Sequence, residues 1–144
     1  MIRKANFDDL SALASLGALL WPHHRAAELE ADFADIMKDP DAAFFLASVG
    51  EEAVGFAQCQ LRHDYVEGTE SSPVGYLEGI FVKEEARMQG LAAKLLSACE
   101  NWAREQGCQE FASDCELHND RSLRFHLALG FREANRIICF TKKL

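Results

Sequence analysis

Three long apolar runs lie in the middle of the chain, each bounded by polar or turn-forming residues. These runs are "AAFFLASV" (42–49), "EAVGFAQCQLR" (52–62) and "VGYLEGIFV" (74–82). Each is rich in residues that favour strands, and Gly50-Glu51 between the first two predicts a hairpin. Shorter runs predict strands at Met1–Lys4 and "EFASD" (110–114), and "FREANRIICFTKK" (131–143) predicts one or two final strands.

Four other segments carry apolar residues at helical spacing. These segments are 6–20, 26–38, 90–106 and 120–129. The first has a capping-box-like start, because Asn6 is followed three residues later by Asp9, and Pro22 in "WPHH" cannot continue it. The resulting order β-α-α-β-β-β-α-β-α-β predicts an α/β or α+β fold with a mixed sheet. With 144 residues, the chain is expected to form a single domain spanning 1–144.

Composition argues against several classes of protein. Hydrophobic residues make up 49%, but no apolar run approaches the roughly 20 residues that span a bilayer. "MIRKANFDDL" has no apolar segment after its basic residues, unlike a signal peptide. The five cysteines form no CxxC pair, which fits reduced thiols in a cytoplasmic protein. His23 and His24 have no further ligands at zinc spacing, so no metal site is expected.

Charge is distributed unevenly along the chain. The net charge of −8 argues against nucleic acid as a partner. Residues 26–85 hold 14 acidic and 3 basic side chains, a net of −11, whereas residues 86–144 hold 7 acidic and 9 basic, a net of +2. Two interpretations remain open: a solvated acidic surface, or a cationic partner near the first half and an anionic one near the second.

The segment that follows the third apolar run has the features of an anion site. "RMQGLA" comprises Arg87, Met88, Gln89, Gly90, Leu91 and Ala92. It connects a strand to a helix, whose first N–H groups lack partners and carry partial positive charge. A glycine there lets a phosphate approach the backbone. Packing of the helix on the sheet through small residues explains the same pattern, and neither a P-loop nor a dinucleotide-binding motif is present.

This strand–turn–helix resembles the pyrophosphate site of the GNAT acetyltransferase superfamily, whose pattern is Gln/Arg-x-x-Gly-x-Gly/Ala. "NDRSLRFHLALGF" (119–131) is similar to the family's second CoA-side helix. The resemblance implies a largely antiparallel mixed sheet, splayed at the acetyl-CoA strand, with helices on both faces. It also implies acetyl-CoA as co-substrate. The implied contacts are "RMQGLA", the backbone of Ile80, Phe81 and Val82, and Asn119, which is equally an ordinary helix cap.

The resemblance narrows to the aminoglycoside 6′-N-acetyltransferases. "LRHDYVEGTESSPVGYLEGIFV" (61–82) carries it through loop residues that core packing would not demand, and "EFASD" and "LWPHH" (20–24) add to it. It implies direct transfer of acetyl to the 6′-amine of a cationic aminoglycoside within a ternary complex. It also implies a homodimer, for which "RIICF" (136–140) offers a strand edge.

Two carboxylates are the principal candidates for the substrate side. Glu78 stands inside an apolar strand, where a carboxylate needs a partner; it is either a structural salt bridge or a ligand and base for the amine. Gly79 beside it suits a β-bulge. Asp114 ends "EFASD" and is either a turn cap or an aminoglycoside ligand. The resemblance supports the ligand role for both and adds Trp21, His24 and Tyr65 to the substrate side.

Two positions depart from the family pattern. His126 stands where many members have a tyrosine general acid, and imidazole can donate a proton near neutral pH. Asn135 stands where the subgroup has an acidic substrate residue, and Glu133 lies close enough in sequence to compensate.

Two alternatives to aminoglycoside acetylation remain open. One is acetylation of another amine, such as a polyamine, a protein lysine or an N-terminus. The other is a non-catalytic acyl-CoA-binding sensor.

Overall fold

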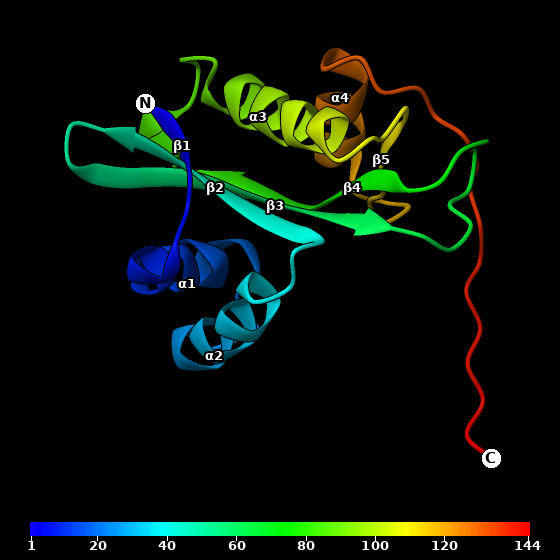
Figure 1. The fold of residues 1–144 in the computed structure, drawn as a ribbon, viewed down its shortest axis with the longest axis horizontal. Coiled ribbons are helices and arrows are strands. Elements are labelled where there is room, and N and C mark those ends of the chain that lie inside the picture. Colours follow the sequence, from blue (N-terminus) through cyan, green and yellow to red (C-terminus); the bar gives the residue numbers. More distant parts are fainter.

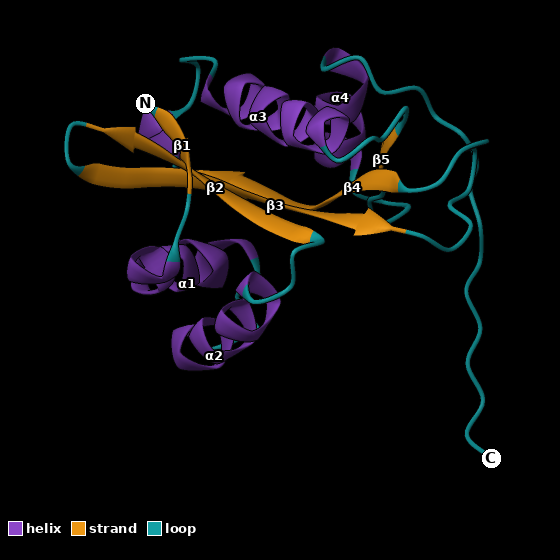
Figure 2. Cartoon of the chain, in the orientation of Figure 1, coloured by secondary structure: helices purple, strands orange, loops and turns teal.

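A five-stranded mixed sheet forms the centre of the molecule in the computed structural model, which describes residues 1–144 (Figures 1 and 2). Its strands are β1 (Ile2–Lys4), β2 (Ala42–Val49), β3 (Glu52–Arg62), β4 (Val74–Val82) and β5 (Phe111–Ser113). They lie in the order β1-β2-β3-β4-β5. The first four pair antiparallel, whereas β5 is parallel to β4.

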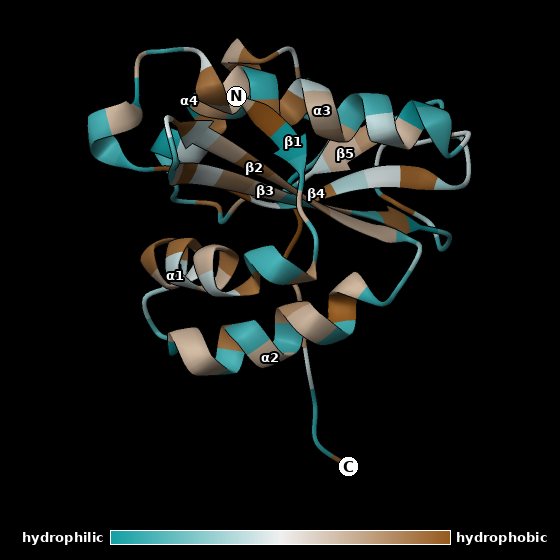
Figure 3. Ribbon diagram, turned by 60° about the vertical axis from the view of Figure 1, so that its left-hand side comes forward, coloured by the Kyte–Doolittle hydropathy of each residue, from teal (hydrophilic) through white to brown (hydrophobic).

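Helices cover both faces of this sheet. They are the 3-10 turn η1 (Phe7–Asp9), α1 (Leu10–Leu20), α2 (Ala26–Met37), the 3-10 turn η2 (Glu84–Ala86), α3 (Leu91–Glu105) and α4 (Asp120–Ala128). Figure 1 places α1 and α2 on one side and α3 and α4 on the other. Each helix layer packs on its own core cluster, and the hydrophobic colours of β2 and β3 between them are visible in Figure 3. No helix is both long and apolar enough to cross a membrane.

Most boundaries expected from the sequence are confirmed. The three long strands have the predicted bounds, and each helix agrees within two residues except that a 3-10 turn opens the first. The capping box is present: the Asn6 side chain accepts from the backbone N–H of Asp8, and Asp9 accepts from that of Asn6. Asp9 also binds Arg3 through both oxygens, which lowers the pKa of this carboxyl.

The prediction of one or two final strands in "FREANRIICFTKK" is wrong for the single chain. Residues 131–144 contain no regular secondary structure, and Figure 1 shows the end of the chain running away from the body. Ile137, Ile138 and Phe140 are 65%, 79% and 87% exposed. A strand needs a neighbouring backbone to satisfy its N–H and C=O groups, and this segment has none within its own chain. We call residues 132–144 the C-terminal tail.

Candidate active site

Strand β4 carries one extra residue at its centre. Gln58 of β3 pairs with Gly79, but the next residue, Cys59, pairs with Leu77. Glu78 therefore has no partner on β3. This register shift is the β-bulge that Gly79 predicts, and it interrupts the regular alternation of side chains along β4.

The bulge directs two consecutive residues toward the layer of α1 and α2. Trp21, which follows α1, lies so close that a Cβ on Gly79 would stand 2.7 Å from its ring carbons. A glycine is therefore required at this position for steric reasons. Glu78 contacts Arg62 of β3, and Arg62 stacks on Tyr76, whose ring belongs to the same face.

The ladder between β4 and β5 ends at the same level. Only three pairs form, and the last is Leu77 with Ser113. Beyond it, β4 continues to Val82 without a neighbour on that side. The splayed sheet expected from the sequence is thus confirmed, and Glu78 and Asp114 are the first residues past the point where the strands separate.

A network of charged and polar groups holds these two carboxylates. Arg62 Nη2 lies 3.0 and 3.2 Å from the two carboxylate oxygens of Glu78, and its Cζ lies 3.4 Å from the centre of the Tyr76 ring. The Tyr76 hydroxyl donates to Asp114. Burial, followed by the bond to Asp114, raises the pKa of Tyr76 well above its usual value. Tyr76 is thus a neutral donor that orients Asp114, while Glu78 keeps a side chain that is 24% exposed.

A serine and a histidine lie on the opposite face of the sheet at this level. His126 Nε2 of α4 is 2.8 Å from Ser113 Oγ, and His126 Nδ1 is 2.7 Å from the backbone oxygen of Ser122. Ser113 shares its face with Phe111, which packs into the cluster beneath α3. The end of the β4–β5 ladder therefore separates two carboxylates on one face from an imidazole–hydroxyl pair on the other.

The start of α3 has the geometry of an anion site. Gly90 is the N-cap residue with φ +73°, and a Cβ added to it would meet no atom within 4 Å. The first N–H groups of a 15-residue helix are therefore approachable. Arg87 is not extended toward them: its Nε donates to the backbone oxygen of Val82 at 2.8 Å, and its guanidinium lies 5.8 Å from the Phe81 ring centre. Met88 is fully exposed.

Asn119 caps α4, since its side chain accepts from the backbone N–H of Ser122 at 3.1 Å. His24 and Tyr65 are both exposed, and Tyr65 lies in the loop that joins β3 to β4. Neither makes a side-chain hydrogen bond to the carboxylates.

The tail crosses that same loop. Asn135 Nδ2 donates to Glu67 at 3.0 Å, so Asn135 contacts a loop carboxylate rather than supplying one. Glu133 is engaged by Arg136, which lowers the pKa of the Glu133 carboxyl.

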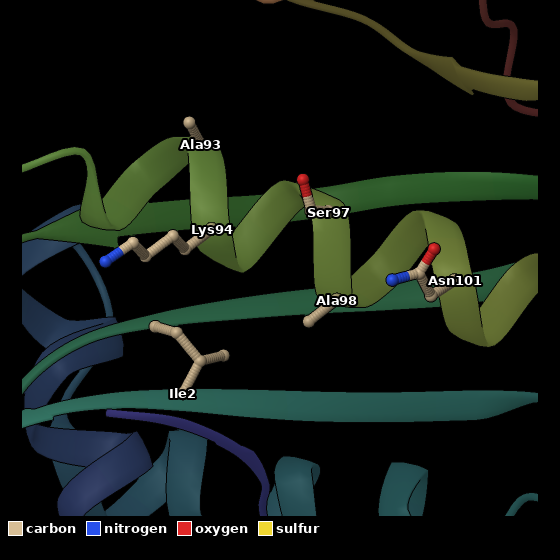
Figure 4. Close-up of a pocket in the computed structure, with 6 residues that line it drawn as sticks. All are labelled: Ile2, Ala93, Lys94, Ser97, Ala98 and Asn101. Carbon is tan, nitrogen blue, oxygen red and sulfur yellow. The ribbon is translucent and has the colours of Figure 1, made fainter.

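A surface hollow between α3 and β1 lies at the other edge of the sheet. Figure 4 shows its residues: Ile2, Ala93, Lys94, Ser97, Ala98 and Asn101. Lys94 is its only charged side chain, and the hollow brings no acid, histidine or thiol together. No group of three or more His, Cys, Asp or Glu residues is arranged to hold a metal ion.

The family model described as the Acetyltransferase (GNAT) family matches residues 10–131. The chain belongs to the GNAT acetyltransferase family. Its splayed sheet and the glycine at the start of α3 agree with the resemblance noted from the sequence, which is confirmed.

Several curated relatives of this GNAT chain share one name. Aminoglycoside N(6′)-acetyltransferase type 1 from Serratia marcescens is 43% identical and covers 100% of this chain and 99% of the relative. The protein of the same name from Salmonella typhimurium (strain LT2) is 41% identical, over 99% of this chain and 98% of the relative.

A solved structure of AAC(6′)-Iy with the bisubstrate analogue CoA-S-monomethyl-acetylneamine is 40% identical with a TM-score of 0.95. The match covers 100% of this chain and 98% of the other. A structure of AAC(6′)-Iy with CoA gives a TM-score of 0.96 at 40% identity, over 100% and 95% of the two chains.

Three residues of the site in this GNAT chain were not found from the sequence. Arg62 and Tyr76 lie on neighbouring strands joined by the 63–73 loop, and only the observed pairing of Gln60 with Tyr76 puts them on one face. The period-two spacing of Tyr76 and Glu78 was an available signal. Ser113 had no signal of its own, because its role depends on a histidine from another element.

Proposed function

We propose that the protein is an acetyl-CoA-dependent N-acetyltransferase that acetylates the 6′-amino group of aminoglycosides. The observation that carries the proposal is the position of Glu78 and Asp114, two carboxylates on one face of a GNAT sheet where β4 and β5 separate. The names of the curated relatives and the bisubstrate complex of AAC(6′)-Iy support the substrate.

Glu78 and Asp114 are proposed to hold ammonium groups of the drug. A carboxylate bond to a charged donor is among the strong hydrogen bonds in proteins, and an aminoglycoside carries several such donors. Arg62 presents a guanidinium to Glu78, so this carboxylate already accommodates a cation at the place proposed for the substrate ammonium. Trp21 borders the site, while His24, Tyr65 and Asn135 are proposed contacts on its outer side.

The acetyl-CoA side is proposed to lie along β4 and the start of α3. The co-substrate supplies an activated thioester carbonyl. The open space over Gly90 fits a pyrophosphate on the helix N-terminus, with Met88, Gln89, Leu91 and Ala92 beside it. The backbone of Ile80, Phe81 and Val82, which lacks a strand partner on the β5 side, is proposed to bind the pantetheine arm and polarise the thioester carbonyl. Arg87 would exchange its bond to Val82 for a phosphate, and Asn119 is a further proposed CoA contact.

The chemistry follows from the placement of the two partners. An alkyl amine arrives protonated at neutral pH, and Glu78 is proposed to accept its proton directly or through water. The amine then attacks the thioester carbon, the C–N bond forms and the C–S bond breaks. Direct transfer requires no acyl-enzyme.

A substrate comparison tests this function. Kanamycin-type drugs with a 6′-amine should release free CoA from acetyl-CoA, whereas matched analogues with a 6′-hydroxyl should not. Equal turnover of both would overturn the regiochemistry. Turnover only with polyamines or peptides would favour another amine as substrate, and CoA binding without turnover on any amine would favour a sensor.

Adding a side chain at Gly90 is expected to weaken acetyl-CoA binding. Valine strains a residue at φ +73°, so Gly90→Asn is the better variant, because asparagine tolerates this conformation. An extra group in the phosphate path costs about 1–3 kcal/mol, so calorimetry should show affinity reduced by roughly 5- to 150-fold. Gly107→Asn is the matched control, since Gly107 has φ +91° and open space at the other end of α3. Unchanged affinity in Gly90→Asn would leave Gly90 a purely structural residue.

We also propose that the protein is a homodimer in which the tail pairs with a second copy. The tail exposes Ile137, Ile138 and Phe140, and β5 is a three-residue edge strand with no partner on its outer side. The match to AAC(6′)-Iy covers the whole chain, the tail included. Pairing with a partner's backbone would satisfy the groups that the tail leaves open.

Ile138→Asp should therefore convert the dimer to a monomer of 16.1 kDa in sedimentation at micromolar concentration. Val49→Asp, which charges a half-exposed residue on the β2–β3 hairpin, should leave the dimer intact. A wild-type chain that sediments as a fully active monomer would contradict the assembly.

A cytoplasmic location is proposed as well. All five cysteines are free, three of them buried, and this pattern is typical of proteins kept in a reducing compartment.

A further inference from the structure

The geometry points to a proton relay in which Ser113, recharged by His126, protonates the thiolate that leaves when acetyl is transferred. This inference rests on the proposed acetyl transfer and names the residues that complete it on the CoA side.

The hydrogen bonds of His126 fix where its protons lie. The backbone oxygen of Ser122 can only accept, so the Nδ1 atom 2.7 Å away carries a hydrogen, and the Ser122 Oγ atom 3.3 Å from Nδ1 is then a second, weaker acceptor. In the neutral ring, Nε2 is then an acceptor, and the Ser113 hydroxyl 2.8 Å away donates to it. When the ring is protonated, Nε2 donates to Ser113 Oγ instead, and the single hydroxyl hydrogen is free to turn elsewhere.

The Ser113 hydroxyl has no strong second partner in the chain. The backbone oxygen of Leu77, across the last pair of the ladder, is 3.4 Å away. That distance lies beyond the usual range for an O–H donor. The hydroxyl thus bonds only weakly across the last pair of the ladder, at the mouth of the gap between β4 and β5.

The side chains on the two faces of the sheet indicate that the leaving group lies at this end of the gap between β4 and β5. Glu78 and Asp114 occupy the face of α1 and α2, so the amine approaches from there. In the proposed reaction the amine meets the acetyl carbon at the level of these carboxylates, one residue past the last pair. The sulfur leaves on the opposite side of that carbon, on the face of α3 and α4, where Ser113 and His126 are joined.

The protons balance over the reaction. The substrate ammonium loses two protons as it becomes an amide N–H: one to the base and one to solvent. The C–S bond breaks with its electron pair on sulfur, which takes the hydrogen of Ser113 Oγ. Ser113 takes the Nε2 hydrogen of the protonated His126, and the ring, held throughout by Ser122, recovers a proton from solvent. One proton is released per acetyl group transferred.

Ser113→Ala and His126→Gln should each slow acetyl transfer in single-turnover experiments with enzyme in excess. General acid catalysis contributes about 100-fold at its lower end. The lower end applies because a thiol ionises near pH 8.5 and its thiolate leaves readily. The KM values for both substrates should stay within about threefold. Ser113→Thr, which keeps the hydroxyl, should recover most of the rate.

The double variant separates a relay from two structural roles. When two groups act in series, removing either one abolishes the contribution of both. The double variant Ser113→Ala/His126→Gln should therefore be no slower than either single variant. Ser97→Ala and His118→Gln, both at exposed positions outside the site, control for the substitutions themselves. Thermal melts should coincide for all folded variants.

Each outcome decides the question. A wild-type rate in Ser113→Ala, or a double variant slowed by the product of the two single effects, would overturn the relay while the wild type still acetylates the drug. A wild type that releases no CoA with any 6′-amine would instead overturn the proposed function, and the relay with it.

Discussion

Glu78→Gln is expected to lower kcat for a 6′-amino aminoglycoside by about 100-fold, even at saturating drug. General base catalysis contributes on this scale, and glutamine cannot take the amine proton. KM should rise by roughly 10- to 100-fold as well, because a hydrogen bond to a charged group contributes about 1.5–3 kcal/mol. Arg62 adds to the rise in KM: without the Glu78 charge, its guanidinium faces the incoming cation unopposed.

Steady-state kinetics across pH would separate these contributions. The acidic limb of the wild-type kcat profile should disappear in Glu78→Gln, because glutamine has no carboxylate to act as the base. Acetyl-CoA affinity should stay unchanged. Glu51→Gln, which removes a charge from the β2–β3 turn, serves as the control. A variant with raised KM but the wild-type kcat and pH profile would make Glu78 a binding residue only.

The sequence predicted the fold well where local signals and packing agree. β2, β3 and β4 are apolar runs bounded by turns, so their ends coincide with the predictions. The capping box at Asn6 and the break at Pro22 are also local signals. β5 was harder: "EFASD" predicts five residues, but only Phe111–Ser113 form the strand, and Asp114 has no strand partner because the ladder to β4 ends at Leu77, beside the bulge.

The candidate site was only partly predictable for a related reason. Glu78 is conspicuous because a carboxylate in an apolar strand needs a partner. Identifying that partner as Arg62 requires the register between β3 and β4, and the length of the intervening loop does not determine this register. Ser113 and His126 meet only because α4 packs beside β5, and no spacing rule connects them. The strand prediction for the tail failed because β propensity does not indicate whether the same chain provides a neighbouring strand for pairing.

The bulge in β4 determines which side chains lie on each face of the sheet at the candidate site. Regular alternation would direct Gly79 toward α3, whereas the bulge directs it beside Glu78 toward Trp21. The same irregularity ends the β4–β5 ladder, so one extra residue in β4 both presents the carboxylate and opens the sheet. The proposed meeting of the amine and the thioester through the sheet requires both of these effects of the bulge.

Asp114→Asn is expected to raise KM for the aminoglycoside by roughly 10- to 100-fold, the cost of a bond to a charged group. It should leave kcat largely intact at saturating drug. Its partner makes the prediction sharper. Tyr76 donates to Asp114 and is buried, so Tyr76→Phe keeps the charge but releases the carboxylate from its orientation. Tyr76→Phe should therefore raise KM by a smaller factor, about three- to tenfold, in line with an ordinary hydrogen bond.

Charge alone must be separated from contact, because the first half of the chain is strongly acidic and attracts cations at a distance. Asp64→Asn removes the same charge from an exposed position in the β3–β4 loop. Its effect should be small and should vanish in about 0.5 M salt, where screening shortens the reach of exposed charges. The Asp114→Asn effect should persist, since a direct contact is screened less. If Asp64→Asn and Asp114→Asn instead raised KM equally and lost their effects together in salt, Asp114 would act only through the field of the acidic surface.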